Sequence, residues 1–127
     1  GVGCVETVAS GPNAVRWARD NGWEGTTGVD LAASARAADP VAVAALQRAG
    51  VALGQAIASA AALLDIETAV LGGGFSAAGP ALWNPIRETV ALHARLGFLE
   101  SFTVVPAALG AVGTLTGAAA LVAPRQP

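Results

Sequence analysis

Lysine, methionine and tyrosine are absent from this 127-residue sequence, and cysteine and histidine occur once each. The single cysteine, Cys4, excludes an internal disulfide framework and is compatible with a reducing compartment, so we expect a cytoplasmic protein. The seven basic residues are all arginines scattered along a chain of net charge −2, without the clustered basic stripe that is typical of nucleic-acid binders. We therefore expect no contact with nucleic acid from this segment.

Charge of either sign is also scarce. Charged residues make up 13% of the chain, against about 25% in an average soluble domain, which predicts that other protein covers much of the surface. The chain begins with Gly1 instead of Met and has no apolar, basic signal region at its start. We therefore expect residues 1–127 to be one part of a longer protein, a single domain at most.

No apolar run is long enough to predict a membrane span. The most apolar stretch, residues 49–64, is shorter than the ~20 residues that a spanning helix needs. Two glycines, Gly50 and Gly54, and two polar residues, Gln55 and Ser59, interrupt it. The stretch predicts a buried helix of a soluble protein, without a membrane partner.

Proline, glycine and capping residues divide the chain into helices and strands. Helices are predicted over residues 12–20, from the N-cap Asp30 to about Ala38, over residues 40–64 after the N-cap Asp39, over residues 80–96 and over residues 110–122. Strands are predicted over residues 68–71 and 102–105, and only the tail 124–127 looks disordered. Strands that alternate with helices indicate an α/β fold, with helices packed on a short, mostly parallel sheet.

The long helix over residues 40–64 has one face without bulky side chains. Gly50, Gly54, Ala58 and Ala62 lie four residues apart, so they form a ridge that allows close approach of a neighbouring helix. Such a stripe is more often a packing feature than a functional one. Trp83 and His93 are expected to pack at a core boundary or on the surface, and Asp65 and Glu67 to form a charged turn instead of an acid/base pair.

The strongest local signal is the segment Val70-Leu71-Gly72-Gly73-Gly74-Phe75-Ser76, a strand that runs into three glycines and then toward a helix. Glycines let backbone N–H groups approach a phosphate closely, and a following helix would add its positive end. The pattern is neither a P-loop nor a dinucleotide fingerprint. A nucleotide site and a plain tight turn at the strand end therefore both remain open.

A second signal is Gly3-Cys4-Val5-Glu6, a thiol and a carboxylate two residues apart in a glycine-rich entry. Cysteine is a soft ligand suited to zinc, and a glutamate can bind sugar hydroxyls. Four-coordinate zinc needs three further ligands, and His93 lies late on a predicted helix. From the residues alone, a buried or inert Cys4 and a zinc ligand completed from residues before Gly1 are both possible.

Taken together, these segments resemble the ROK family (repressors, open reading frames, kinases). Gly3-Cys4-Val5-Glu6 is similar to the end of its C-x-C-G-x-x-G-C-x-E signature, with Gly1-Val2 as the x-x pair. The remaining matches run in the family's order: Asp39-Pro40-Val41-Ala42, Leu53-Gly54, Leu64-Asp65-Ile66-Glu67, Val70-Leu71-Gly72-Gly73-Gly74, Pro106-Ala107-Ala108-Leu109-Gly110 and Gly117-Ala118-Ala119. The stretch Gly110-Ala111-Val112-Gly113-Thr114 departs from the family pattern, which usually has polar or acidic residues there and then Ala-Gly.

The resemblance implies the C-terminal lobe of an actin-like, ribonuclease-H-like sugar kinase fold. It implies Cys4 as a ligand of a structural Zn²⁺ whose site is incomplete in this chain, Glu6 as a ligand of the sugar hydroxyls, and Gly72, Gly73 and Gly74 as part of the ATP site. The family's aspartate base, its phosphate loop and its other zinc ligands would lie before Gly1. No catalytic residue is therefore assigned here, and we expect the fragment alone to be inactive.

For the full-length protein, the resemblance implies a homo-oligomeric, glucokinase-like transferase of carbohydrate metabolism. It would move the γ-phosphoryl group of ATP, with Mg²⁺, to a hexose such as glucose. The alternative is a sugar-sensing ROK transcriptional repressor, distinguished by an N-terminal helix-turn-helix and by absence of the aspartate and the phosphate loop. A third possibility is a non-functional gene fragment. The sequence leaves the sugar and the phosphoryl donor open.

Overall fold

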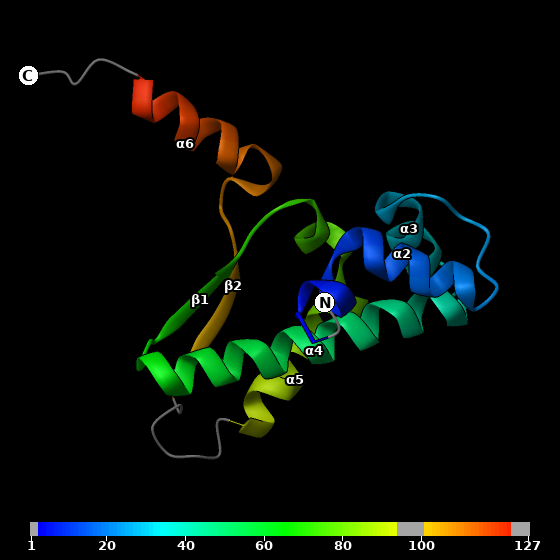
Figure 1. Cartoon of the computed structure of the whole chain (residues 1–127), viewed down its shortest axis with the longest axis horizontal. Helices are drawn as coiled ribbons and strands as arrows, with labels where there is room; N and C mark the ends of the chain where they lie inside the picture. Colours follow the sequence, from blue (N-terminus) through cyan, green and yellow to red (C-terminus); the bar gives the residue numbers. More distant parts are fainter. Residues whose placement is uncertain (1–2, 94–100, 123–127) are drawn as a thin grey trace, which may run out of the picture.

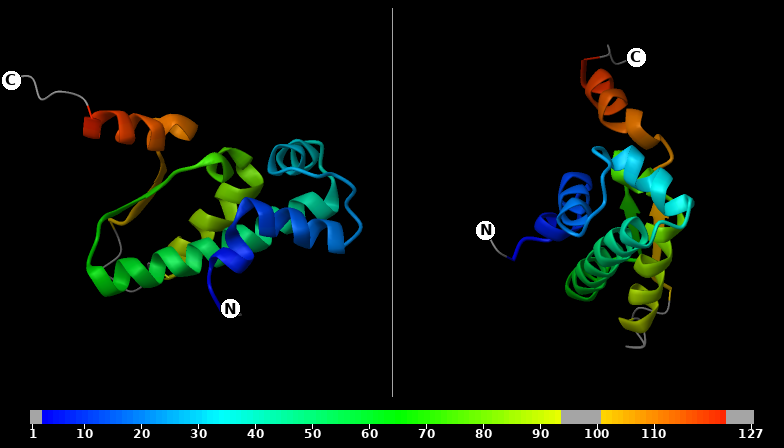
Figure 2. Two further views of the ribbon diagram at one scale, coloured as in Figure 1. Left: turned by 45° about the horizontal axis from the view of Figure 1, so that its top comes forward. Right: turned by 90° about the vertical axis from the view of Figure 1, so that its right-hand side faces the viewer.

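The computed structural model describes residues 3–93 and 101–122, and it is organised around one long helix. This helix, α4 (Pro40–Leu64), has α1 (Glu6–Ala9), α2 (Gly11–Asp20) and α3 (Gly28–Arg36) packed against it, and α5 (Pro80–His93) lies on its other side (Figures 1 and 2). The largest fully buried side chains are Leu31, Leu46, Leu82 and Ile86, from α3, α4 and α5. The core therefore lies between α4 and the helices on either side of it.

A small parallel sheet follows α4. β1 (Thr68–Leu71) pairs in parallel with β2 (Thr103–Pro106), in a register that places Thr68 opposite Thr103 and Leu71 opposite Pro106. The 3₁₀ helix η1 (Gly74–Ala78) and α5 connect the two strands, and the 3₁₀ helix η3 (Gly110–Val112) and α6 (Gly113–Val122) follow β2. This arrangement confirms the predicted α/β class with parallel pairing.

Most element bounds agree with the prediction, because proline and capping residues mark them. The side chain of Asp39 accepts a hydrogen bond from the Ala42 N–H at 2.8 Å, and α4 ends at Leu64, with Asp65 in the left-handed conformation. β2 begins one residue later than expected and includes Pro106, and the last helix starts as η3. The expected end of the fourth helix at residue 96 and the tail 124–127 lie outside the described residues.

The assignment of Asp30 as an N-cap is wrong, because α3 begins three residues earlier, at Gly28. The N-cap is Thr27, whose hydroxyl accepts a hydrogen bond from the Asp30 N–H at 3.1 Å, while a carboxylate oxygen of Asp30 accepts one from the Thr27 N–H at 2.9 Å. This is a capping box, with the acidic residue in the third helical position. Hydrogen bonds from the Thr27 side chain and backbone hold the pKa of the Asp30 carboxyl below its usual value. The earlier start places Gly28 and Val29 in the first turn of α3.

α4 and α5 approach each other closely at the predicted small-residue ridge. A Cβ atom on Gly54 would lie 2.6 Å from the Thr89 Cβ and 3.0 Å from the Ile86 carbonyl oxygen, and one on Gly50 would lie 2.6 Å from the Leu82 carbonyl oxygen. These distances are too short for a side chain, so glycine is required at both positions. Ala58 is also buried, but Ala62 is exposed, so the contact ends before the last turn of α4.

By length and composition alone, α4 qualifies as a candidate membrane span, since its most apolar window has a mean hydropathy of 1.4. The core helix of a soluble protein has the same properties. Four helices pack around α4, and its buried residues form the centre of the apolar core. We therefore interpret it as a core helix, as the sequence predicts.

Other apolar side chains are exposed at the C-terminal end of the described chain. α6 packs chiefly against η3 and lies apart from α4 (Figure 2), and Leu115 is 73% and Leu121 88% exposed. On the sheet, Val70 is 65% exposed. These surfaces agree with the expectation, drawn from the low charge content, that other protein covers part of this segment.

The close approach of α4 and α5 predicts a specific stability effect. In the full-length protein, Gly54→Val should lower the free energy of unfolding by about 1–3 kcal/mol, because the new methyl groups overlap Thr89 and force the helices apart. Ala62→Val, on the same ridge but exposed, is the matched control and should leave the melting temperature unchanged. Equal melting temperatures for the two variants would contradict the packing role of Gly54.

Candidate functional site

The triple glycine forms an open turn at the end of β1. Gly73 has φ +83° and ψ 171°, a backbone conformation that glycine adopts and other residues rarely do. A Cβ atom on Gly73 or Gly74 would meet no atom within 4 Å. Among the hydrogen bonds of the described residues, none engages the backbone N–H of Gly73 or Gly74. The turn therefore presents two backbone donors beside open space.

The segment after the glycines differs from the expected helix. η1 is a 3₁₀ helix of five residues, and α5 begins only at Pro80. The Ser76 hydroxyl donates a 2.7 Å hydrogen bond to the Gly73 carbonyl oxygen, and the Ser76 N–H donates to the same oxygen at 3.2 Å. The turn is therefore fixed by Ser76, and no long helix contributes a positive end directly after it.

The triple glycine borders a hollow of about 250 Å³, which we call the glycine hollow. The chain from Leu71 to Ser76 forms one side, and the α1–α2 corner, Ala9 to Gly11, forms the other, with Leu53 of α4 between them. The Asn13 side-chain amide ties this corner together, since it donates to the Glu6 carbonyl oxygen at 2.7 Å and to the Ser10 hydroxyl at 2.8 Å. Elements far apart in the sequence thus meet at the glycines.

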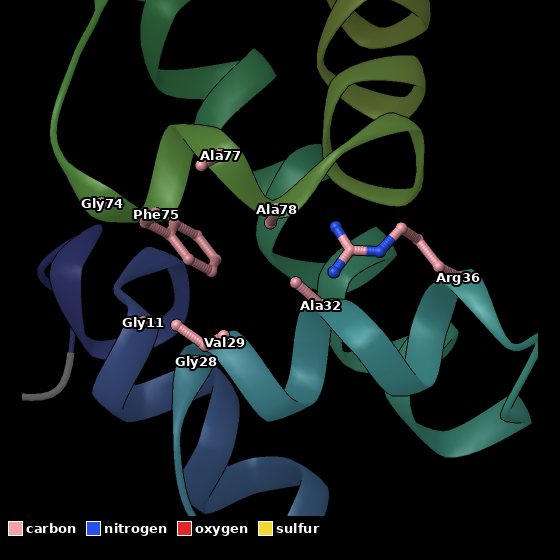
Figure 3. Close-up of a pocket in the computed structure, with 9 residues that line it drawn as sticks. All are labelled: Gly11, Gly28, Val29, Ala32, Arg36, Gly74, Phe75, Ala77 and Ala78. Atoms are coloured by element: carbon pink, nitrogen blue, oxygen red, sulfur yellow. The ribbon is translucent and has the colours of Figure 1, made fainter. Parts of the chain in front are cut away.

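A larger apolar slot of about 450 Å³, the α3–η1 slot, lies beside this hollow, and Figure 3 shows the residues that line it. One wall comes from α3 and the other from η1, and the slot shares Gly11, Gly74 and Phe75 with the glycine hollow. Its remaining lining residues are Gly28, Val29, Ala32, Arg36, Ala77 and Ala78. The shared residues place the two cavities next to each other, and the slot has the size and apolar character of small-molecule pockets.

Trp83 of α5 holds the η1 wall in place. Its indole Nε1–H donates a 2.8 Å hydrogen bond to the Ser76 carbonyl oxygen, the ring is 8% exposed, and the Arg87 guanidinium lies 5.3 Å from the ring centroid. The expectation that Trp83 packs is therefore confirmed, and it also supports the slot. His93 is exposed, with Nδ1 2.8 Å from the Thr89 carbonyl oxygen, as expected for a surface position.

Glu6 is the first residue of α1 and Cys4 lies two residues before it, and both are exposed. Of the alternatives for Cys4, burial is therefore excluded, and an inert thiol and a zinc ligand stay open. α1 leads from Glu6 to Ala9 at the glycine hollow, a rise of about 4.5 Å along the helix. The structure thus brings Glu6 within about one helical turn of the cavity that the triple glycine borders. The sequence predicted both features but not their proximity.

The described residues do not complete a zinc site. No group of three or more His, Cys, Asp or Glu side chains that could hold a metal ion occurs within residues 3–93 and 101–122. Cys4 therefore supplies at most one ligand in this part of the chain. Nor do any carboxylates line the described walls of the slot or the glycine hollow.

Sequence reasoning missed the α3–η1 slot, although one local signal was available. Gly28 and Ala32 lie four residues apart on α3, and Ala77 and Ala78 are equally small on η1. Small residues on two facing segments leave room between them. Because the pairing of α3 with η1 depends on tertiary packing, the sequence pattern did not show that the segments face each other.

Comparison with known proteins identifies a family likeness over almost the whole chain. The sequence profile of the ROK family matches residues 1–125. The kanosamine kinase of Amycolatopsis mediterranei (strain S699) is 33% identical over 119 residues, which make up 94% of this chain and 39% of that protein.

Two solved structures are similar in fold. One is a ROK family glucokinase from Streptomyces griseus in complex with glucose and AMPPNP, with a TM-score of 0.81 at 30% identity over 95% of this chain and 45% of that one. The other is a ROK family transcriptional regulator, a homolog of the E. coli MLC protein, with a TM-score of 0.72 at 27% identity over 84% of this chain and 29% of that one. The chain therefore spans less than half the length of each of these relatives.

Proposed function

The chain belongs to the ROK family and has part of the actin-like fold of its sugar kinases, and from this we propose that the full-length protein is an ATP-dependent kinase that phosphorylates a hexose such as glucose. The similar kanosamine kinase and the glucokinase in complex with glucose and AMPPNP support a sugar kinase. The described segment would then form one wall of the cleft in which sugar and nucleotide meet.

One observation carries the proposal: the backbone N–H groups of Gly73 and Gly74, which make no hydrogen bond to another described residue, border a hollow that lies beside an apolar slot. Backbone donors at a glycine turn suit phosphate oxygens, and an apolar slot suits a nucleobase. An inorganic polyphosphate would have no use for such a slot. The combination therefore favours a nucleoside triphosphate as the phosphoryl donor.

The sugar would bind at the α1 end of the site. A carboxylate accepts hydrogen bonds from sugar hydroxyls, and Glu6 lies about one helical turn from the glycine hollow. A sugar held by Glu6 and phosphates held at Gly73 would thus be neighbours. That proximity is the requirement for direct transfer.

In the transfer, a sugar hydroxyl oxygen forms a bond to the γ-phosphorus, the bond from that phosphorus to the bridging oxygen of ADP breaks, and the hydroxyl proton passes to a base. The family resemblance assigns that base to an aspartate before Gly1. Gly73 and Gly74 would orient the phosphates and offset their charge through N–H donors. Mg²⁺ bound to the nucleotide would neutralise further phosphate charge, and ligands for it would come from elsewhere in the protein.

Further expectations belong to the same proposal. Cys4 is exposed, so further zinc ligands from the rest of the protein can reach it. A structural Zn²⁺ at Cys4 is therefore proposed for the full-length protein. A cytoplasmic, homo-oligomeric enzyme that contacts neither membrane nor nucleic acid through this segment is also proposed. These expectations rest on composition and on the family resemblance.

A sugar-sensing transcriptional repressor is the second candidate, favoured by the likeness to the ROK regulator. A repressor of this family would have an N-terminal helix-turn-helix and would lack the aspartate. The adjacent glycine hollow and slot favour the kinase, because a sugar sensor needs no nucleotide site.

Glu6→Gln in the full-length protein tests the sugar side of the site. We expect at least about tenfold weaker sugar binding and turnover, since hydrogen bonds to a carboxylate contribute about 1.5–3 kcal/mol each, with nucleotide affinity nearly unchanged. Sugar KM, kcat and the ATP dissociation constant are the measurements. Glu88→Gln, an exposed glutamate on α5 outside both cavities, is the control. A variant that keeps its sugar kinetics but loses ATP affinity would show that Glu6 is misassigned.

Gly73→Val tests the nucleotide side. The two methyl groups would enter the open space where phosphates are proposed to bind, so calorimetric titration should find ATP binding abolished or severely reduced. Gly22→Val is the matched control, because Gly22 also has a positive φ, +95°, with nothing within 4 Å of its Cβ position, but lies outside the site. Both variants place valine at a positive φ, and only Gly73→Val should lose ATP. Normal ATP binding by Gly73→Val would contradict the nucleotide site and would show that the triple glycine is only a turn.

A further inference from the structure

The α3–η1 slot has one polar side chain among the described residues that line it, and that side chain is Arg36. Figure 3 shows its guanidinium pointing along the slot from the end opposite Gly74, beside Ala78. Among the described residues, no hydrogen bond to another side chain or ion pair engages this guanidinium. Arg36 therefore presents its donors to whatever occupies the slot.

The order of groups along the site fixes which part of a nucleotide reaches Arg36. The phosphates are proposed to bind at Gly73 and Gly74, and the slot begins at Gly74 and the Phe75 ring. The Phe75 ring projects into the slot in Figure 3, where a base can stack on it. A base that extends from the phosphates past Phe75 would meet Arg36 with its outer edge.

A guanidinium donates hydrogen bonds and accepts none. Guanine and hypoxanthine offer two adjacent acceptors, O6 and N7, which match a bidentate guanidinium, whereas adenine offers N7 next to the N6 amino donor. The remaining side chains of the described slot are apolar or absent, so none of them can favour the amino group of adenine.

We propose that Arg36 is a specificity-determining residue that binds the purine edge of the phosphoryl donor and favours 6-oxo purines, so that GTP and ITP serve as donors besides ATP. This inference rests on the proposed nucleotide site at the triple glycine. It assigns the slot to the base and assigns base selection to one side chain. ATP remains a donor because its adenine fits the same apolar walls.

The test measures dissociation constants of ADP, GDP and IDP, each with Mg²⁺, for the full-length protein by calorimetric titration. Arg36→Met should weaken GDP and IDP binding at least about fivefold more than ADP binding, the effect of losing one bidentate contact. IDP should follow GDP, because the two share O6 and N7. Arg19→Met, an exposed arginine on α2 outside the slot, is the control and should change none of the three.

A second variant tests the slot itself. Val29 lines the slot and is 76% exposed, so Val29→Trp should fill the slot without disturbing the core. It should weaken all three nucleotides and leave inhibition by inorganic tripolyphosphate, which has no base, unchanged. Val51→Trp, at an exposed position of α4 outside the slot, is the matched control.

Equal losses of ADP, GDP and IDP in Arg36→Met would overturn the assignment of base selection to Arg36, as would unchanged binding of all three. Normal nucleotide binding by Val29→Trp would overturn the slot as the base compartment. Failure of the proposed function is seen separately, as absence of sugar-dependent turnover in the wild type, because the titrations need no turnover. A wild-type protein that binds no nucleotide at all overturns both.

Discussion

The candidate site depends on the close contact between α4 and α5. Gly50 and Gly54 let the α5 backbone come within reach of α4, and this contact fixes the position of α5. α5 carries Trp83, whose indole N–H holds the Ser76 carbonyl oxygen, and Ser76 in turn fixes the triple-glycine turn. A backbone contact in the core is thus linked, through one buried indole, to the exposed N–H groups proposed to bind phosphate.

The parts of the fold that the sequence predicted are those with local physical causes. Asp39 and Pro40 mark the start of α4 because a carboxylate cap and a proline in the first turn both favour a helix start. The predicted start of α3 was wrong. Aspartate is a common N-cap residue, but Asp30 is the third helical residue and forms a capping box with the N-cap Thr27. Both roles use the same residue types, and only the geometry distinguishes them.

The candidate site was predictable only in part, for a similar reason. The triple glycine and the Cys4–Glu6 pair are short patterns, and each left alternatives open. Their meaning comes from tertiary packing, which places the α1–α2 corner opposite Gly73 and places α3 opposite η1. The small residues of α3 and η1 were a local signal for the slot, but the sequence does not show that these two distant segments face each other with Arg36 at one end.

The central claim is that this ROK segment supplies one wall of the cleft of a sugar kinase. Release of ADP by the full-length protein, measured with and without a panel of hexoses, tests it most directly. The account predicts ADP release in the presence of ATP, Mg²⁺ and at least one hexose, with little release when the hexose is omitted. ADP release that does not change when any hexose is added would contradict the claim. Absence of ADP release under every condition, together with sugar-dependent binding to DNA, would also contradict it and would favour the repressor.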